Sequence, residues 1–81
     1  MKNLENDNYS TSDLALATAL SIFCPVELVD RQNPHKALFV FKNSKKLKQI
    51  VETYWRKEMK LEVQTYFNQL KSLKSRLYEE K

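Results

Sequence analysis

The sequence predicts a small single α+β domain in which a helix, a β-hairpin and two further helices follow one another (α-β-β-α-α). The chain has 81 residues, which suits one domain, and 42% of them are hydrophobic, which is enough for a compact core. Apolar residues recur at helical spacing in three segments. Two short runs of β-branched and aromatic residues lie between the first and the second of these segments, as expected of a hairpin.

The first predicted helix spans about residues 12–23. The hydroxyl groups of Ser10, Thr11 and Ser12 are suited to accept hydrogen bonds from its first N–H groups, and the acidic Asp13 suits the positive end of the helix dipole. Pro25 ends it, because the residue before a proline is disfavoured in the α region. Residues 1–10 have few apolar side chains to offset the entropy of ordering, so we expect a disordered tail there and the compact domain over residues 11–81.

The hairpin is predicted from the runs Val26–Asp30 and Ala37–Phe41. Because the chain has no glycine, a two-residue turn with positive φ is disfavoured, and we expect a longer connection. Within it, Asn33 and Pro34 suit the first two positions of a type I turn. Ala37–Phe41 is apolar on both faces, so helices should cover at least one side and a partner can meet the other.

The second helix is predicted over about residues 45–58, with Ser44 as its N-cap. Its apolar positions are Leu47, Ile50, Val51, Tyr54, Trp55 and Met59. A second apolar stripe follows, made of Val63, Tyr66, Phe67, Leu70, Leu73, Leu77 and Tyr78. The two stripes differ in phase by about 130° on one helical wheel, so a single straight helix cannot turn both toward one small core. We therefore expect a break near residues 57–62 and a third helix after it.

Several functional classes are disfavoured by composition. The absence of glycine excludes phosphate-binding loops that need it. The single cysteine and the single histidine lie 11 residues apart and match no metal-site spacing, so we expect no metal and no cofactor. Cys24 is expected as a small buried hydrophobe rather than a reactive thiol, and His35 as an exposed imidazole rather than a general base. No pair of carboxylates suggests acid–base catalysis, so we expect no enzyme.

The polar N-terminus has no apolar leader core, and no run of 18 apolar residues occurs. We therefore expect a cytoplasmic protein without a membrane contact.

Charge is distributed unevenly along the chain. Residues 1–41 carry a net charge of −2 and residues 42–81 a net charge of +6. Four lysines surround the expected start of the second helix, namely Lys42, Lys45, Lys46 and Lys48. They oppose the helix dipole, whose positive end favours an anion. Two interpretations stay open: an anion site, or a solvated lysine edge.

The third predicted helix carries Lys71, Lys74 and Arg76. On a helical wheel Lys74 falls inside the apolar stripe, Lys71 borders it and Arg76 points away. Lys74 either extends along the edge of the core to reach solvent or contacts a phosphate. The aromatic residues of the last two helices are suited to stack on bases, but their helical spacing indicates the core first.

A family resemblance rests on five parts of the chain: Ser12–Ala17, Leu38–Phe41, the pairs Tyr54-Trp55 and Tyr66-Phe67, and Leu70–Tyr78. Over about residues 11–78 the chain resembles a small uncharacterised domain family of bacteria and their phages, with a C-terminal YF-x2-LK-x-LK-x-R-x-Y helix. The resemblance implies a bacterial or phage cytoplasmic protein and, since the family has no established activity, no functional residue.

This chain departs from the family pattern in two places. The pattern has acidic or proline residues entering the second helix and a glycine after the first aromatic pair. Here lysines and Arg56-Lys57 stand in those places. The departure leaves the basic residues of the third helix as the better supported set.

The leading hypothesis is a non-enzymatic module that binds DNA or RNA phosphates through its basic half. The expected contacts are Lys42, Lys45, Lys46, Lys48, Lys71, Lys74 and Arg76. The alternative is a protein-interaction or assembly module, including a homodimer, that uses the strand Ala37–Phe41 or exposed aromatic surface.

Overall fold

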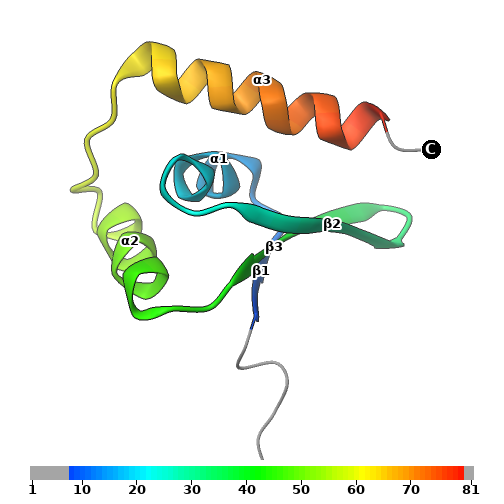
Figure 1. Ribbon diagram of the computed structural model, residues 1–81, viewed down its shortest axis with the longest axis horizontal. Coiled ribbons are helices and arrows are strands. Elements are labelled where there is room, and N and C mark those ends of the chain that lie inside the picture. Colours follow the sequence, from blue (N-terminus) through cyan, green and yellow to red (C-terminus); the bar gives the residue numbers. More distant parts are fainter. Residues whose placement is uncertain (1–7, 80–81) are drawn as a thin grey trace, which may run out of the picture.

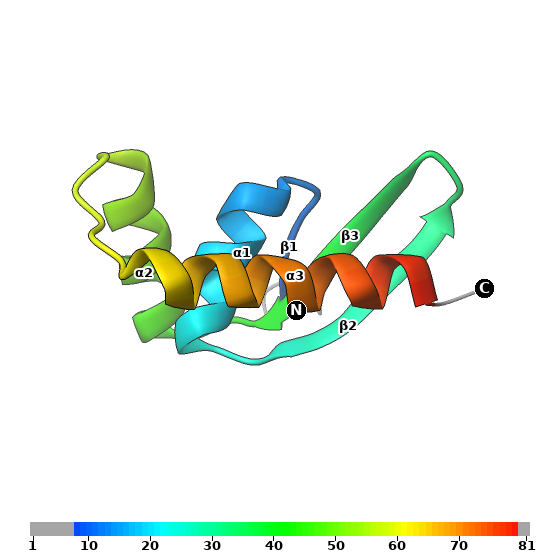
Figure 2. The same cartoon turned by 90° about the horizontal axis from the view of Figure 1, so that it is seen from above.

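The chain forms a three-stranded antiparallel sheet and three helices in the order β-α-β-β-α-α (Figure 1). The computed structural model describes residues 8–79. Helix α1 lies between the sheet and α3, and α2 packs against α1 (Figures 1 and 2). The elements are β1 (Asn8–Thr11), α1 (Leu14–Phe23), β2 (Val26–Asn33), β3 (Lys36–Lys42), α2 (Lys45–Trp55) and α3 (Val63–Glu79). The α+β class is confirmed, with one strand more than predicted.

The additional strand, β1, corrects the predicted extent of the N-terminal tail. Residues 8–10 belong to this strand, and residues 1–7 lie outside the described part of the chain. Tyr9 lies opposite Phe41 and packs against the core. Its neighbours in the strand are polar, so no local apolar pattern predicts it. The strand forms because β3 offers it backbone donors and acceptors.

The sheet order is β1-β3-β2, which makes β3 the central strand. Over Phe39–Phe41 the backbone is paired on both sides, with β1 and with β2. The sequence suggested the strand Ala37–Phe41 for docking a partner, but a partner strand cannot pair with its residues 39–41. An edge is free for a partner only where its N–H and C=O groups have no strand beside them.

The hairpin connection is shorter than predicted. Asn33 pairs with Lys36, so only Pro34 and His35 connect the strands. Asn33 is the first residue of the turn and Pro34 the second, as expected, and the His35 N–H donates to Asn33 Oδ1 at 2.9 Å. No turn residue has a positive φ. The register of β2 shifts between Asp30 and Asn33, and this irregularity adapts the strands to a turn whose twist does not match theirs.

A second irregularity of β2 decides which of its side chains reach the core. Val26 and Val29 both pack against the core although three positions separate them, which would place them on opposite faces of a regular strand. The register shifts between Val26 and Leu28, so Glu27 is an extra residue and the phase changes there. Leu28 is exposed as a result.

The core is built around α1. Leu16, Ala17 and Leu20 are buried, and Thr18 is buried as well, with its hydroxyl donating to the Leu14 carbonyl oxygen at 2.8 Å. The sheet, α2 and α3 contribute the remaining buried core residues, which are Phe39, Phe41, Leu47 and Leu73. Helix α1 is thus nearly apolar all round because it packs on three sides.

The predicted break between the last two helices is confirmed. Residues 56–62 form a linker between α2 and α3, and α2 ends at Trp55 rather than near residue 58. The Lys57 N–H donates to the Tyr54 carbonyl and the Glu58 N–H to the Thr53 carbonyl, at 3.0 and 3.1 Å. This pair of bonds is the Schellman motif, and Lys57 takes its left-handed position with φ 63°.

Replacing Lys57 with glycine is expected to stabilise the domain by about 1 kcal/mol, because a side chain in the left-handed region crowds its own backbone. Urea unfolding of the wild type and of Lys57→Gly measures the gain. Lys57→Ala removes the same charge but keeps a Cβ, so it serves as the matched control. Equal stability of the Gly and Ala variants would show that the backbone at this position carries no cost.

Candidate functional site

The seven predicted contact cations are all exposed. Among the described residues, none of their side chains forms an ion pair or a hydrogen bond. They fall into two groups on opposite sides of the molecule (Figure 1). The first group surrounds the start of α2 and the second lies on the C-terminal half of α3. The structure therefore does not bring all seven onto one surface.

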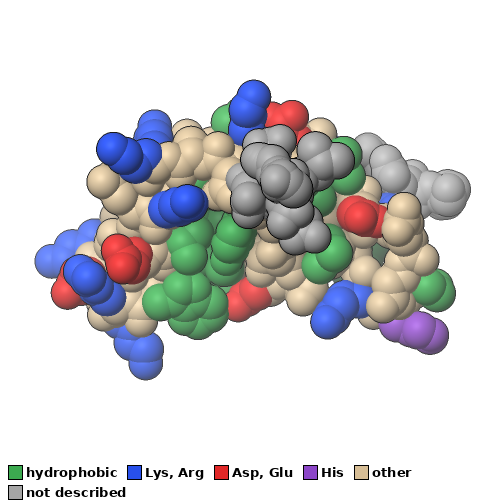
Figure 3. All heavy atoms as spheres, turned by 90° about the horizontal axis from the view of Figure 1, so that it is seen from below, with side chains coloured by type: hydrophobic (Ala, Val, Ile, Leu, Met, Phe, Trp, Pro, Cys, Tyr) green, Lys and Arg blue, Asp and Glu red, His purple; other side chains and the backbone are tan. Residues whose placement is uncertain are grey.

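The first group is part of a larger basic surface. Arg56, Lys57 and Lys60 are also exposed, and residues 42–60 carry a net charge of +5. We call this stretch the α2 end. Lysine and arginine side chains gather over it in Figure 3. The sequence-based set omitted the three cations after α2 because it was chosen around the helix start. Counting charge through the linker would have found them.

The start of α2 adds to the positive potential. Ser44 caps the helix, since its Oγ accepts from the Leu47 N–H at 3.0 Å, as predicted. The first turn holds no acidic residue, and Lys45 and Lys46 occupy it instead. Their charges and the helix dipole have the same sign at this point. Among the described residues, the one ion pair at the α2 end joins Arg56 and Glu52 at 3.9 Å, and since both groups are exposed it adds little stability.

Trp55, the last residue of α2, has 59% of its surface exposed and lines two mainly apolar pockets. Its ring meets that of Tyr54 edge to face, with the centroids 5.1 Å apart. The linker pocket, of about 380 Å³, is lined mainly by Tyr54, Trp55, Lys57, Met59, Leu61 and Tyr66. The strand pocket, of about 300 Å³, is lined by Tyr9, Leu47, Lys48, Val51, Glu52 and Trp55.

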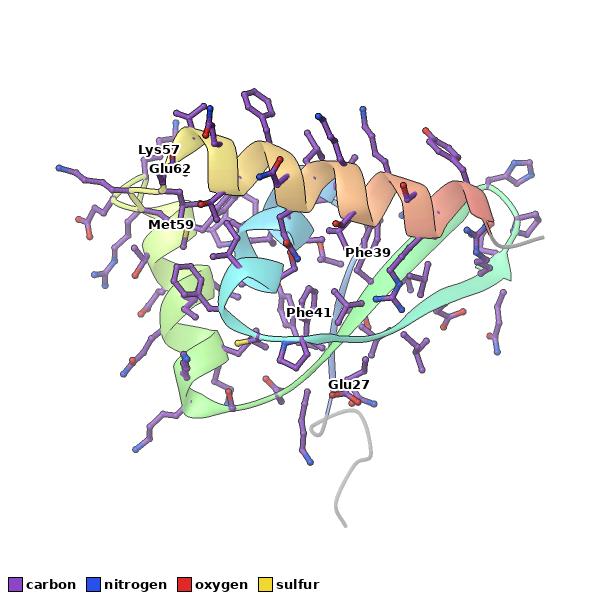
Figure 4. The ribbon with its side chains drawn as sticks, turned by 45° about the horizontal axis from the view of Figure 1, so that its top comes forward. Glu27, Phe39, Phe41, Lys57, Met59 and Glu62 are labelled. Carbon is purple, nitrogen blue, oxygen red and sulfur yellow. The ribbon has the colours of Figure 1, made fainter. Side chains whose placement is uncertain are left out.

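Hydrogen bonds fix the start of α3 beside the linker pocket, which Tyr66 lines. Glu62 caps α3, because its Oε1 accepts from the Thr65 N–H at 2.8 Å (Figure 4). These hydrogen bonds lower the pKa of Glu62, so the cap stays charged. The Tyr66 hydroxyl donates to the Ala15 carbonyl at 3.4 Å and joins the start of α3 to α1. Burial raises the pKa of the Tyr54 hydroxyl above its usual value, and the nearby Asp13 and Tyr66 raise it further. Tyr54 therefore stays uncharged where it lines the linker pocket.

Helix α3 turns part of its apolar stripe toward solvent. Among the α3 side chains that the structure describes, only Leu73 is buried, and Phe67 and Tyr78 are exposed although their spacing indicated the core first. Val63, Phe67 and Tyr78 are exposed and form an outer face with Lys71 and Lys74. This arrangement explains the lysine inside the predicted stripe, since the stripe is wider than the buried part of the helix. Arg76 points away from that face.

The remaining chemical candidates are isolated. Cys24 is a free, half-buried thiol, and His35 is exposed in the hairpin turn. Within residues 8–79 no three metal-ligating side chains come together. No helix in that range is long and apolar enough to span a membrane.

Comparison with protein families decides the relationship of this chain. The model of a domain of unknown function, DUF5659, matches residues 6–79. The chain belongs to the DUF5659 family. The resemblance to an uncharacterised family is thereby confirmed, and DUF5659 membership carries no activity with it. No curated protein and no solved structure matches the chain significantly.

Proposed function

We propose that this DUF5659 domain binds nucleic-acid phosphates through the α2 end. The observation that carries the proposal is the net charge of +5 over residues 42–60, on exposed side chains gathered at one end of the molecule. Lys42, Lys45, Lys46 and Lys48 have no acidic partner among the described residues. Lysines at a helix start also cost stability, and a bound anion offsets this cost.

The contacts at this surface are point charges on phosphate oxygens. Lysine ammonium groups position a nucleic acid without reading its sequence. Affinity then falls with salt, by about 0.9 log units per log unit of salt for each phosphate bound on a duplex and about 0.7 on a single strand. The C-terminal half of α3 lies across the molecule from the start of α2 (Figure 1), so the Lys71, Lys74 and Arg76 that it carries are not part of this surface.

The double variant Lys45→Glu/Lys46→Glu is expected to weaken binding and to reduce the salt slope by about 1.5 units, since two phosphate contacts are lost. The measurement is a fluorescence-anisotropy titration of a labelled DNA at several salt concentrations. Glutamates in the first turn agree with the helix dipole, so the variant should be more stable than the wild type by about 0.3–1 kcal/mol per residue. Loss of binding would therefore not reflect unfolding.

The matched control is Lys71→Glu/Lys74→Glu, which makes the same change of charge on α3. We expect it to alter the salt slope much less than the α2 variant does. Equal losses in both variants would indicate a response to total charge rather than a site. Absence of binding to DNA and RNA at about 50 mM salt, where phosphate contacts are strong, would refute the proposal.

The outer face of α3 favours a second candidate function, protein interaction. Val63, Phe67 and Tyr78 expose apolar surface along one side of this helix. Such a face suits a partner helix or a second copy of the chain. Analytical ultracentrifugation of the protein alone tests for binding to a second copy of the chain. A monomer at all concentrations would count against self-association.

A further inference from the structure

We propose that the nucleic acid is single-stranded and that Trp55 lies between two consecutive bases, one in the linker pocket and one in the strand pocket. The inference rests on the proposed function, because it names the ligand class of the same surface. It explains a feature that phosphate binding alone leaves unexplained, namely two apolar pockets in the most basic part of the molecule.

Trp55 is placed as a stacking residue rather than a core residue. Trp55 is 59% exposed, whereas the neighbouring Tyr54 is half-buried. The rings of the two residues meet edge to face. An exposed indole contributes little to folding, but bases stack on aromatic rings with a gain of about 1–3 kcal/mol per base. Since Trp55 lines both pockets, a base in either pocket can contact its indole ring.

Each pocket pairs apolar walls with one lysine, and the strand pocket also includes Glu52, whose carboxylate forms an ion pair with Arg56 at 3.9 Å. Lys57 lines the linker pocket and Lys48 lines the strand pocket. A nucleotide has the same two parts, a flat apolar base and an anionic phosphate. A base in each pocket leaves the adjoining phosphates for Lys48 and Lys57. Lys48 and Lys57 thus offer ammonium groups to the phosphates, and Trp55 offers an aromatic ring to the bases.

Duplex DNA does not fit this arrangement. Its bases are paired and stacked, so only its phosphates reach the surface, and extruding a base costs a few kcal/mol. A single strand presents unpaired bases without that cost. A second copy of the chain is also disfavoured, because two surfaces with a net charge of +5 repel each other.

Trp55 is the only tryptophan of the chain, so its fluorescence reports on this site directly. The probes are an oligothymidylate of about 8 nucleotides, within the size range of single-strand sites, and a blunt duplex of similar charge. We expect the oligothymidylate to quench the Trp55 emission and to bind more tightly, and the duplex to bind through phosphates with little quenching. Trp55→Ala should weaken oligothymidylate binding about 10-fold or more, with duplex binding nearly unchanged.

Trp55→Phe is the matched variant, because it keeps a stacking ring and should retain most of the affinity. Circular dichroism of both variants checks the fold, which an exposed side chain is expected to leave intact. Equal affinity for the two probes without quenching, and with no effect of Trp55→Ala, would overturn this inference and leave the phosphate-binding proposal standing. If neither probe binds, or if only an acidic peptide quenches Trp55, both proposals are overturned.

Discussion

Replacing Phe41 with alanine is expected to destabilise the domain by about 3–5 kcal/mol, the largest effect of any single change considered. Phe41 is 0% exposed and lies on the central strand, opposite Tyr9 on one side and Val26 on the other. It belongs to the same cluster as Leu16, Leu20 and Leu47. An alanine there leaves a cavity where the sheet and the helices meet.

Urea unfolding followed by circular dichroism measures this loss. A domain of this length has a total stability of about 4–12 kcal/mol. If the stability of the wild type lies near the lower end of this range, a substantial fraction of the variant should be unfolded without urea. Phe67→Ala is the matched control, because Phe67 is 54% exposed on α3. We expect it to cost less than about 1 kcal/mol. Similar unfolding midpoints for the two variants would contradict the assignment of the core.

Leu73→Ala is expected to cost about 2–5 kcal/mol and to loosen α3 more than the sheet. Leu73 is 2% exposed and is the one buried side chain among residues 63–78 of this helix. Tyr66, Leu70 and Leu77 are only half-buried. The Arg31 side chain donates to the carbonyl oxygens of Arg76 and Leu77, so it retains the C-terminal end of α3 on β2. The variant therefore tests how much of the docking of α3 depends on a single contact.

Hydrogen exchange gives the measurement that separates local from global loss. We expect protection of the α3 amides to fall further than protection of the β3 amides. Leu70→Ala removes the same atoms from a half-buried position and should cost less. Uniform loss of protection across both elements would show that α3 and the sheet unfold as one unit.

The proposed site and the stability of α2 are in conflict, and this conflict is informative. Lys45 and Lys46 stand where acidic residues would stabilise the helix start, and Lys57 stands where glycine would relieve the left-handed turn. Lys45 and Lys46 form the start of α2, and Lys57 lines the linker pocket. Substitutions that raise stability at these positions are the ones expected to weaken binding, as is common at functional sites.

Much of the fold follows from local pattern. The spacing of Leu47 to Trp55 predicts α2, and the phase change after it predicts a break near residues 57–62, which the structure has at residues 56–62. Ser44 caps α2 and Pro25 follows the end of α1, as the sequence predicts. Asp13, expected inside the first turn of α1, is instead its N-cap. These features depend on residues within one or two turns of each other, so a single sequence is sufficient to predict them.

The remaining features depend on residues far apart in the chain. β1 exists because β3, about 30 residues later, pairs with it, and the two-residue hairpin turn is accommodated by an irregular register. The strand pocket combines Tyr9 with α2, and the linker pocket combines α1, the linker and α3. No spacing rule within one segment predicts such combinations, because they are set by packing.

The sequence by itself determined the helices, the break between α2 and α3, the family resemblance and the basic character of residues 42–81. Tertiary structure alone decided that the seven cations separate into two groups, that α3 exposes Phe67 and Tyr78, and that Trp55 lines two pockets. The physical reason is that periodicity tells which side chains share a face of an element, whereas burial depends on how much of that face the rest of the chain covers.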